Sequence, residues 1–136
     1  MMAFARRPEE IAVVTVIFND EHKDVSSIEE LNEALTRFDD EPNFDLWVSI
    51  PDGPMINMIR NGPDAFLMYL RFAEDTGFTS RSHVPRVGTA SFRLANGQVD
   101  DFPLSWCIDR EQCYKAVAHF CANEGERPKW IAWHED

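Results

Sequence analysis

Apolar and polar residues alternate along the chain with two different periods, one typical of strands and one of helices. Residues 11–18 are almost all β-branched or apolar, which predicts a buried strand followed by an acidic loop. Between residues 28 and 38 the apolar positions recur with the period of an amphipathic helix. Ser26 and Ser27 precede that helix and each has a glutamate three residues later, so the sequence predicts a capping box at one of them.

Closely spaced strands follow in the middle of the chain. Residues 44–50 place Phe, Leu, Val and Ile at every second position, which predicts one strand. Two more strands, 55–60 and 65–72, follow after short turns rich in Pro, Gly, Asn and Asp. Spacing this short indicates an antiparallel meander. Residues 73–88 are polar and contain two glycines, so we expect a loop there, with a short strand around 79–84.

A hairpin comes next in the pattern. The dipeptide Asn96-Gly97 lies between two arms of strand-like composition, residues 89–94 and 99–106, and favours a type I′ turn. Pro103 interrupts the second arm and has no N–H to donate to a neighbouring strand. The sequence therefore places that arm at an edge or at a bulge.

The end of the chain contains two of its four tryptophans. It follows a second predicted helix, which Asp109 caps and Gly125 closes. Chain ends fray unless something holds them, so two large aromatic rings indicate that residues 130–133 form a strand docked into the sheet. Successive strand residues face opposite sides, so Trp130 and Trp133 should point to opposite faces, one of them available to a partner if only one face is covered. We expect both to be structural residues that anchor this strand, and contact with a partner is the alternative.

Together these elements predict an α+β fold, an antiparallel sheet of about six or seven strands with two helices packed on it. We expect residues 1–136 to form a single domain, with residues 1–8 as a flexible N-terminal extension. No apolar run approaches the ~20 residues that a membrane helix needs, and the first residues lack the pattern of a signal peptide. The expected location is the cytoplasm, without membrane association.

The net charge of −11 is concentrated in the first third of the chain. Residues 9–52 contain 13 acidic residues against Lys23 and Arg37, whereas residues 53–136 contain 11 acidic and 9 basic residues. A field of that sign repels nucleic acid and attracts a basic partner, although solubility alone is a sufficient alternative explanation. The candidate partner-binding acids lie in the first loop, on the first helix and at its end, and in the loop after residue 72: Asp20, Glu21, Asp24, Glu29, Glu30, Glu33, Asp39, Asp40, Glu41, Glu74 and Asp75.

Catalytic chemistry has no clear motif in the sequence. Zinc deaminases need His-x-Glu with Pro-Cys-x-x-Cys, and the three cysteines, Cys107, Cys113 and Cys121, do not have that spacing. The last two lie roughly 12 Å apart along a predicted helix, too far for a disulfide. We expect reduced thiols, no cofactor, no metal and no enzymatic activity; an enzyme that uses Cys107 or a histidine is a competing hypothesis.

Five stretches in order carry a family resemblance: Asp45-Leu46-Trp47-Val48 with the Pro-Asp-Gly turn, Asn61-Gly62-Pro63-Asp64-Ala65-Phe66-Leu67, Asp101-Phe102-Pro103, Glu111-Gln112 with Ala116 and Phe120, and Gly125-Glu126-Arg127-Pro128 with Trp133. In this order and spacing the chain resembles immunity protein family 1 of bacterial polymorphic toxin systems. The resemblance covers residues 11–136 and is weakest in the N-terminal third.

The resemblance implies a protein that binds and neutralises a cognate toxin and catalyses nothing. Partners in that family often have a deaminase fold, among them toxins that act on cytosine in double-stranded DNA. A toxin of that kind grips a polyanion with a basic groove, which an acidic inhibitor can reach quickly and occlude. Immunity against a nuclease toxin and a small-ligand-binding regulatory domain are the alternatives.

Overall fold

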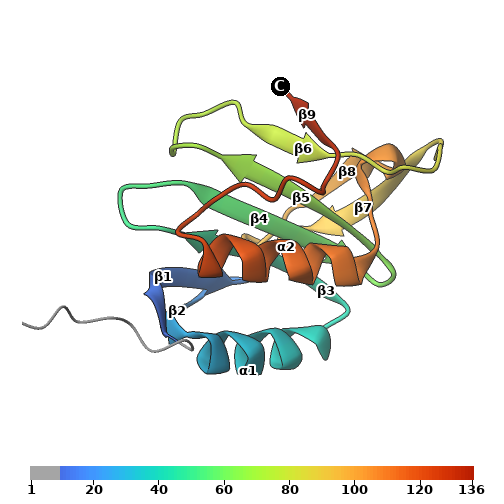
Figure 1. Cartoon of the computed structure of the whole chain (residues 1–136). Coiled ribbons are helices and arrows are strands. Elements are labelled where there is room, and N and C mark those ends of the chain that lie inside the picture. Colours follow the sequence, from blue (N-terminus) through green and yellow to red (C-terminus); the bar gives the residue numbers. More distant parts are fainter. Residues whose placement is uncertain (1–9) are drawn as a thin grey trace, which may run out of the picture.

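The structure is a computed structural model that describes residues 10–136, so the extension predicted at residues 1–8 lies outside the described residues. Nine strands are described: β1 (Glu10–Phe18), β2 (Glu21–Ser27), β3 (Asn43–Ser49), β4 (Met55–Asn61), β5 (Asp64–Leu70), β6 (Phe78–Ser80), β7 (Thr89–Arg93), β8 (Val99–Pro103) and β9 (Trp133–Glu135). Seven of them form one antiparallel sheet in the order β2-β1-β3-β4-β5-β6-β9, and β7 pairs with β8 alone (Figure 1).

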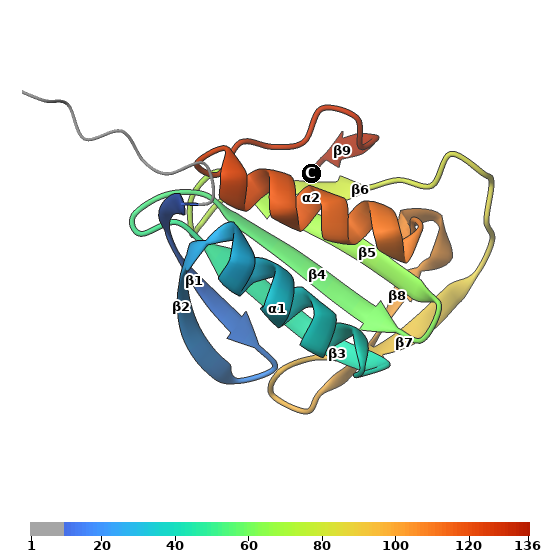
Figure 2. The same ribbon diagram turned by 60° about the horizontal axis from the view of Figure 1, so that its bottom comes forward.

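Two helices, α1 (Ile28–Asp39) and α2 (Arg110–Ala122), lie side by side on one face of this sheet (Figure 2). The predicted α+β class, with two helices on an antiparallel sheet, is therefore confirmed. Antiparallel register aligns the apolar residues of neighbouring strands, so Val16, Val48 and Ile56 form one row beneath the helices. Helix side chains cover the strands from above, among them Leu31, Phe38, Val117 and Phe120.

The second face of the sheet is partly covered as well, by the β7–β8 hairpin. Ile59 and Phe66 point to this face and form a small second core with Phe92 and Cys107. The ring of Phe66 contacts that of Phe92 edge-on, with the ring centroids 5.1 Å apart. The sheet thus has a helical layer on one side and a hairpin over part of the other.

The acidic loop predicted after the first strand is wrong, because residues 21–27 form β2. Only Asn19 and Asp20 separate it from β1, with Asn19 in the left-handed conformation at φ 56°. β2 is an edge strand in which only Val25 is buried, so it lacks the apolar alternation that identifies a strand. Asp20 lies in the turn, whereas Glu21 and Asp24 belong to this strand.

The hairpin turn also differs from the prediction. A type I′ turn at Asn96-Gly97 needs a positive φ at both residues, and of the two only Gly97 has one, at 86°. The Gly97 N–H donates to the Leu94 carbonyl over 2.9 Å, so the turn is centred one residue earlier. β8 ends at Pro103, in keeping with the edge position predicted from the proline.

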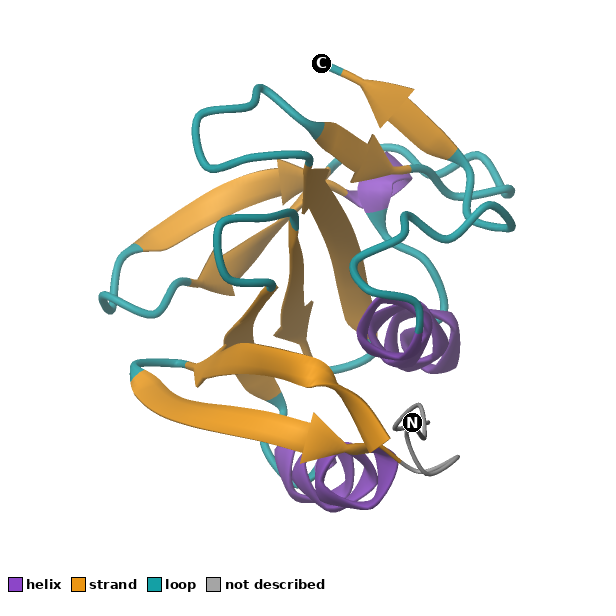
Figure 3. Cartoon of the chain, turned by 60° about the vertical axis from the view of Figure 1, so that its left-hand side comes forward, coloured by secondary structure: helices purple, strands orange, loops and turns teal. Residues whose placement is uncertain are grey.

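At the end of the chain the strand begins later than predicted. β9 contains Trp133 but not Trp130, so the expectation that the two rings face opposite sides of one strand is wrong. Figure 3 shows β9 at the opposite end of the sheet from β1 and β2. Gly125 lies two residues after the α2 C-cap, Asn123, and an added Cβ there would lie 2.4 Å from Cγ of Pro54. This close approach, with φ at 85°, requires glycine.

Candidate protein-binding face

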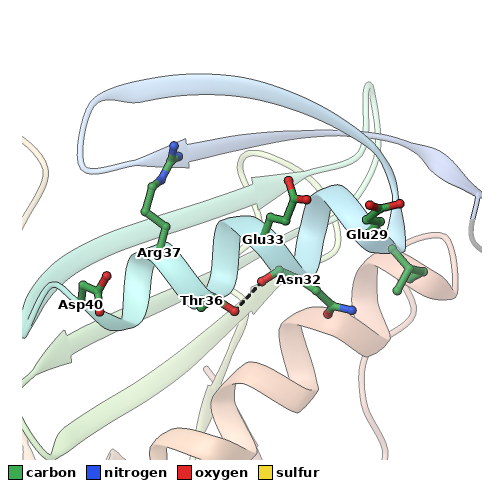
Figure 4. Close-up of a pocket in the computed structure, with 7 residues that line it drawn as sticks. Glu29, Asn32, Glu33, Thr36, Arg37 and Asp40 are labelled. Carbon is green, nitrogen blue, oxygen red and sulfur yellow. Dashed lines mark hydrogen bonds between the residues drawn. The ribbon is translucent and has the colours of Figure 1, made fainter.

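The exposed side of α1 lines a wide, open hollow with a volume of about 880 Å³ (Figure 4). Helical spacing brings its residues onto one side, because positions three and four apart lie above one another. We call this surface the α1 outer face and define it by Ile28, Glu29, Asn32, Glu33, Thr36, Arg37 and Asp40. The opposite side of the helix carries Leu31, Ala34 and Phe38 into the core.

Acidic side chains on the α1 outer face have no partner within residues 10–136. Glu29, Glu33 and Asp40 are exposed and form no ion pair or side-chain hydrogen bond with any residue that the structure describes. Arg37 is the one basic residue of α1, and its guanidinium lies 5.6 Å from the centroid of the Phe38 ring. Glu41 is likewise exposed just beyond the helix. The result is a local negative field at the surface.

Glu21 extends this acidic surface toward the β1–β2 turn. It lines a smaller hollow of about 230 Å³ together with Arg37 and Phe38, at the border of the α1 outer face. Asp24 pairs in register with Thr15 and accepts a hydrogen bond from its hydroxyl over 3.2 Å. It therefore belongs to the other face of the sheet, while Asp20 stays exposed in the turn.

Two acids of α1 have structural partners. The Glu30 N–H donates to Oγ of Ser27 over 3.1 Å, and its carboxylate accepts from the Ser26 N–H, which makes Ser27 the N-cap of the helix. Asp39 accepts from the Tyr114 hydroxyl over 2.9 Å and pairs with Arg60 and Arg110, each at 3.3 Å.

Asp39 thereby joins the end of α1 to α2 and to β4. Arg60 has a side chain only 7% exposed and also donates to the backbone carbonyls of Asp39, Glu41 and Gly62. Burial and the hydrogen bond to Asp39 raise the pKa of Tyr114, which keeps its hydroxyl protonated as the donor. This carboxylate is a fastening point of the fold.

In the loop after β5, one of the two candidate acids, Asp75, has a structural partner and the other, Glu74, is exposed. Asp75 accepts from Nε and Nη2 of Arg71 over 2.8 and 2.9 Å, and from the Arg71 N–H over 3.0 Å. These hydrogen bonds hold the pKa of the Asp75 carboxyl well below its usual range. Glu74 is exposed and has no side-chain partner among the described residues.

In the C-terminal segment, most of the residues that carry the family resemblance hold the segment in place. Trp133 donates from Nε1 to the Pro128 carbonyl over 2.7 Å, and its ring lies 6.3 Å from that of Tyr69. The guanidinium of Arg127 lies 3.9 Å from the centroid of the Phe78 ring. Trp130, by contrast, is 44% exposed and contacts α2 through Gln112 and His119.

A family model described as Immunity protein Imm1 matches residues 12–135. The chain belongs to this family. A search of curated proteins finds no match. Membership indicates an immunity protein, whose partner is a toxin. The Arg-Pro and Trp positions of this Imm1 chain hold its C-terminal segment against the sheet.

The thiols of this Imm1 chain are placed for packing. All three cysteines are free and buried, and burial raises the pKa of Cys107 to about 11 and that of Cys121 to about 12. A thiol of that kind is almost fully protonated near pH 7 and is a poor nucleophile. Among the described residues no group of His, Cys, Asp or Glu could hold a metal ion, and no helix is long and apolar enough to cross a membrane.

One polar pair escaped the sequence analysis. Asp45 and Asn57 lie on adjacent strands, β3 and β4, facing the hairpin side of the sheet, and both are buried. Along β3, Asp45 alternates with Phe44 and Leu46 of the main core, so it lies on the opposite face of the strand. Its burial comes from the β7–β8 hairpin, and nothing in the sequence pattern says where that hairpin lies.

Proposed function

We propose that this immunity protein neutralises a nucleic-acid deaminase toxin by docking the α1 outer face over the toxin's basic active-site groove. The observation that carries the proposal is the set of acids on that face, Glu29, Glu33 and Asp40, which have no partner among the described residues. Exposed carboxylates of this kind do little for folding. They are available to meet cations of another protein.

Electrostatics supports a partner that binds polyanions. An enzyme that acts on DNA or RNA gathers Lys and Arg around its groove, because phosphate contacts dominate nucleic-acid affinity. An acidic helix presented to that groove speeds encounter and excludes the substrate by occupying the same surface. The chain itself, at a net charge of −11, would be repelled by nucleic acid.

The deaminase is the preferred toxin class and a nuclease is the second, because both need a groove of the same charge. The family assignment supports the toxin partner, and the resemblance described above supports the deaminase. In this proposal the immunity protein acts in the cytoplasm of the toxin-producing cell, covering the active site before the toxin reaches nucleic acid.

Co-expression tests the proposal. The toxin domain encoded beside this gene is expressed alone, with the immunity protein, and with its Glu29→Lys/Glu33→Lys variant. We expect the wild type to restore growth and to suppress cytosine-to-uracil changes in the DNA of the host, and the variant to protect less. Restored growth without any such changes from the free toxin would replace the deaminase by another toxin class. No protection by a folded wild-type chain would overturn the proposal.

A further inference from the structure

A groove on the hairpin side of the sheet has a polar floor and apolar walls. It lies between β3, β4 and β5 and the tip of the β7–β8 hairpin, and its volume is about 410 Å³. We call it the hairpin groove. Asp45 and Asn57 form its floor, and Trp47, Met68 and Phe102 are among its apolar walls. The α1 outer face lies on the other side of the sheet.

Strand register explains this composition. Trp47, Asn57 and Met68 are direct cross-strand neighbours on β3, β4 and β5, so they form one row on the hairpin side. Asp45 and Ile59 belong to the next row of the same face. Asn57 therefore points between a tryptophan and a methionine, with a carboxylate beside it.

The Asn57 amide is only half satisfied. Its Nδ2 donates to Oδ1 of Asp45 and to the Leu46 carbonyl, both over 2.8 Å. Its Oδ1 is buried and accepts no hydrogen bond from the described part of the chain, although the residue is only 1% exposed. A buried acceptor without a donor costs free energy. This oxygen therefore needs a hydrogen-bond donor that the described part of the fold does not supply.

Asp45 lacks a cation in the same place. Its carboxylate accepts from Asn57 and from the Ala95 N–H over 3.0 Å, but it forms no ion pair within residues 10–136, and the residue is 6% exposed. Buried carboxylates are normally paired with a positive group. The groove floor thus carries a negative charge and a free acceptor side by side.

We propose that the hairpin groove receives a lysine or arginine side chain of the toxin, which rests on the function proposed above. The positive head group would donate a hydrogen bond to Oδ1 of Asn57 and neutralise the charge of the Asp45 carboxylate. The apolar walls match the aliphatic stem of such a side chain, and Trp47, which also lines the groove, would make a cation–π contact with the head group. The toxin would then contact this chain at two sites, the acidic helix and one anchored basic residue.

The first test needs no toxin. The purified chain is titrated with n-butylguanidinium chloride at constant ionic strength, and amide signals are followed by NMR, with 1-butanol as the uncharged control. We expect saturable shifts at the Ala95 N–H and the Asn57 side-chain amide that butanol does not produce, weakened at least fivefold by Asp45→Asn. Equal shifts with butanol, or none at these groups, would overturn the cation site.

Two lysine variants keep the test independent of any effect that Asp45→Asn has on the fold. Met68→Lys places a cation directly opposite Asn57 on β5, while Ser49→Lys adds the same charge on the same face of the sheet, on β3 and outside the groove. Met68→Lys should abolish the titration, and Ser49→Lys should keep it. Met68→Gln separates the loss of the apolar wall from the added charge, and should retain binding of butylguanidinium within threefold.

The toxin then separates the two proposals. If the wild type protects against the toxin, Met68→Lys should bind it at least tenfold more weakly than Ser49→Lys. Protection with equal affinity of these two variants would overturn the groove as a toxin contact and leave the proposed function intact. A chain that gives no protection contradicts the proposed function, and with it the toxin as occupant, whatever the titration shows.

Discussion

The polar groups of the α1 outer face are mostly unpaired within residues 10–136, whereas those of the C-terminal segment contact neighbouring groups of the fold. On the α1 outer face, Glu29 and Glu33 face solvent without a partner among the described residues. In the C-terminal segment, the Trp133 N–H and the Arg127 guanidinium are both engaged by neighbouring groups. The first surface contributes little to folding and is available for binding, whereas the second holds β9 at the edge of the sheet.

Adjacent residues show the same contrast at the end of α1. Asp39 is held by Arg60, Arg110 and Tyr114, while Asp40 next to it is exposed and unpaired among the described residues. Reversing the charge of residues 39, 40 and 41 together would therefore disturb the fold as well as the surface. Asp40 and Glu41 alone report on binding.

Replacing Arg60 should have the largest effect on stability. Arg60→Met leaves three backbone carbonyls without their donor and removes one of the two arginines that pair with Asp39, and we expect a loss of about 3 kcal/mol in the free energy of unfolding. Urea denaturation followed by tryptophan fluorescence measures it. Arg37→Met on the α1 outer face is the matched control and should change stability by less than about 0.5 kcal/mol. Equal losses would remove the distinction between paired and unpaired charges.

The two C-terminal tryptophans should differ next. Trp133→Ala removes a ring packed against Tyr69 and a hydrogen bond to the Pro128 carbonyl, and should cost about 2 kcal/mol. Trp130→Ala removes a ring that is 44% exposed and should cost under about 1 kcal/mol. Thermal unfolding of both variants checks the order. A larger loss at Trp130 would show that the segment is held from its exposed side.

A smaller effect should appear on acidification. The hydrogen bonds from Arg71 lower the pKa of Asp75 in the folded state below its ordinary 3.8, so the stabilisation is present above that value and is lost as the pH falls below it. The stability gap between wild type and Asp75→Asn should therefore be largest near pH 7 and shrink toward pH 3. Glu74→Gln, the unpaired neighbour, should show no such change. A gap that stays constant with pH would contradict the ion pair.

Much of the architecture could be predicted from the sequence, because the core strands and both helices carry strong apolar periods. Edge elements could not: β2 buries only Val25, and β9 has just three residues, so neither has a period to detect. Their pairing partners are set by the rest of the sheet. The same limit explains why Trp130 was assigned to a strand that begins at Trp133.

The candidate acids were found as a group, but their roles could not be separated by sequence. Asp39 and Asp75 meet arginines at different separations along the chain, Arg60 and Arg71, and only the folded chain shows which carboxylates are paired. The hairpin groove was missed for a related reason. Asp45 becomes a buried group only when a hairpin about 50 residues later covers it, through the Ala95 N–H.

The most direct test of the central claim is the association rate of the purified chain with its neighbouring toxin, measured by stopped flow from low to high salt. Glu33→Lys on the α1 outer face is compared with Glu111→Lys, an equal charge change at an exposed position of α2. We predict that Glu33→Lys slows association about tenfold at low salt and flattens its salt dependence, while Glu111→Lys changes the rate by less than about threefold. Equal effects of the two reversals would show that only net charge matters, and that the α1 outer face is not where the toxin binds.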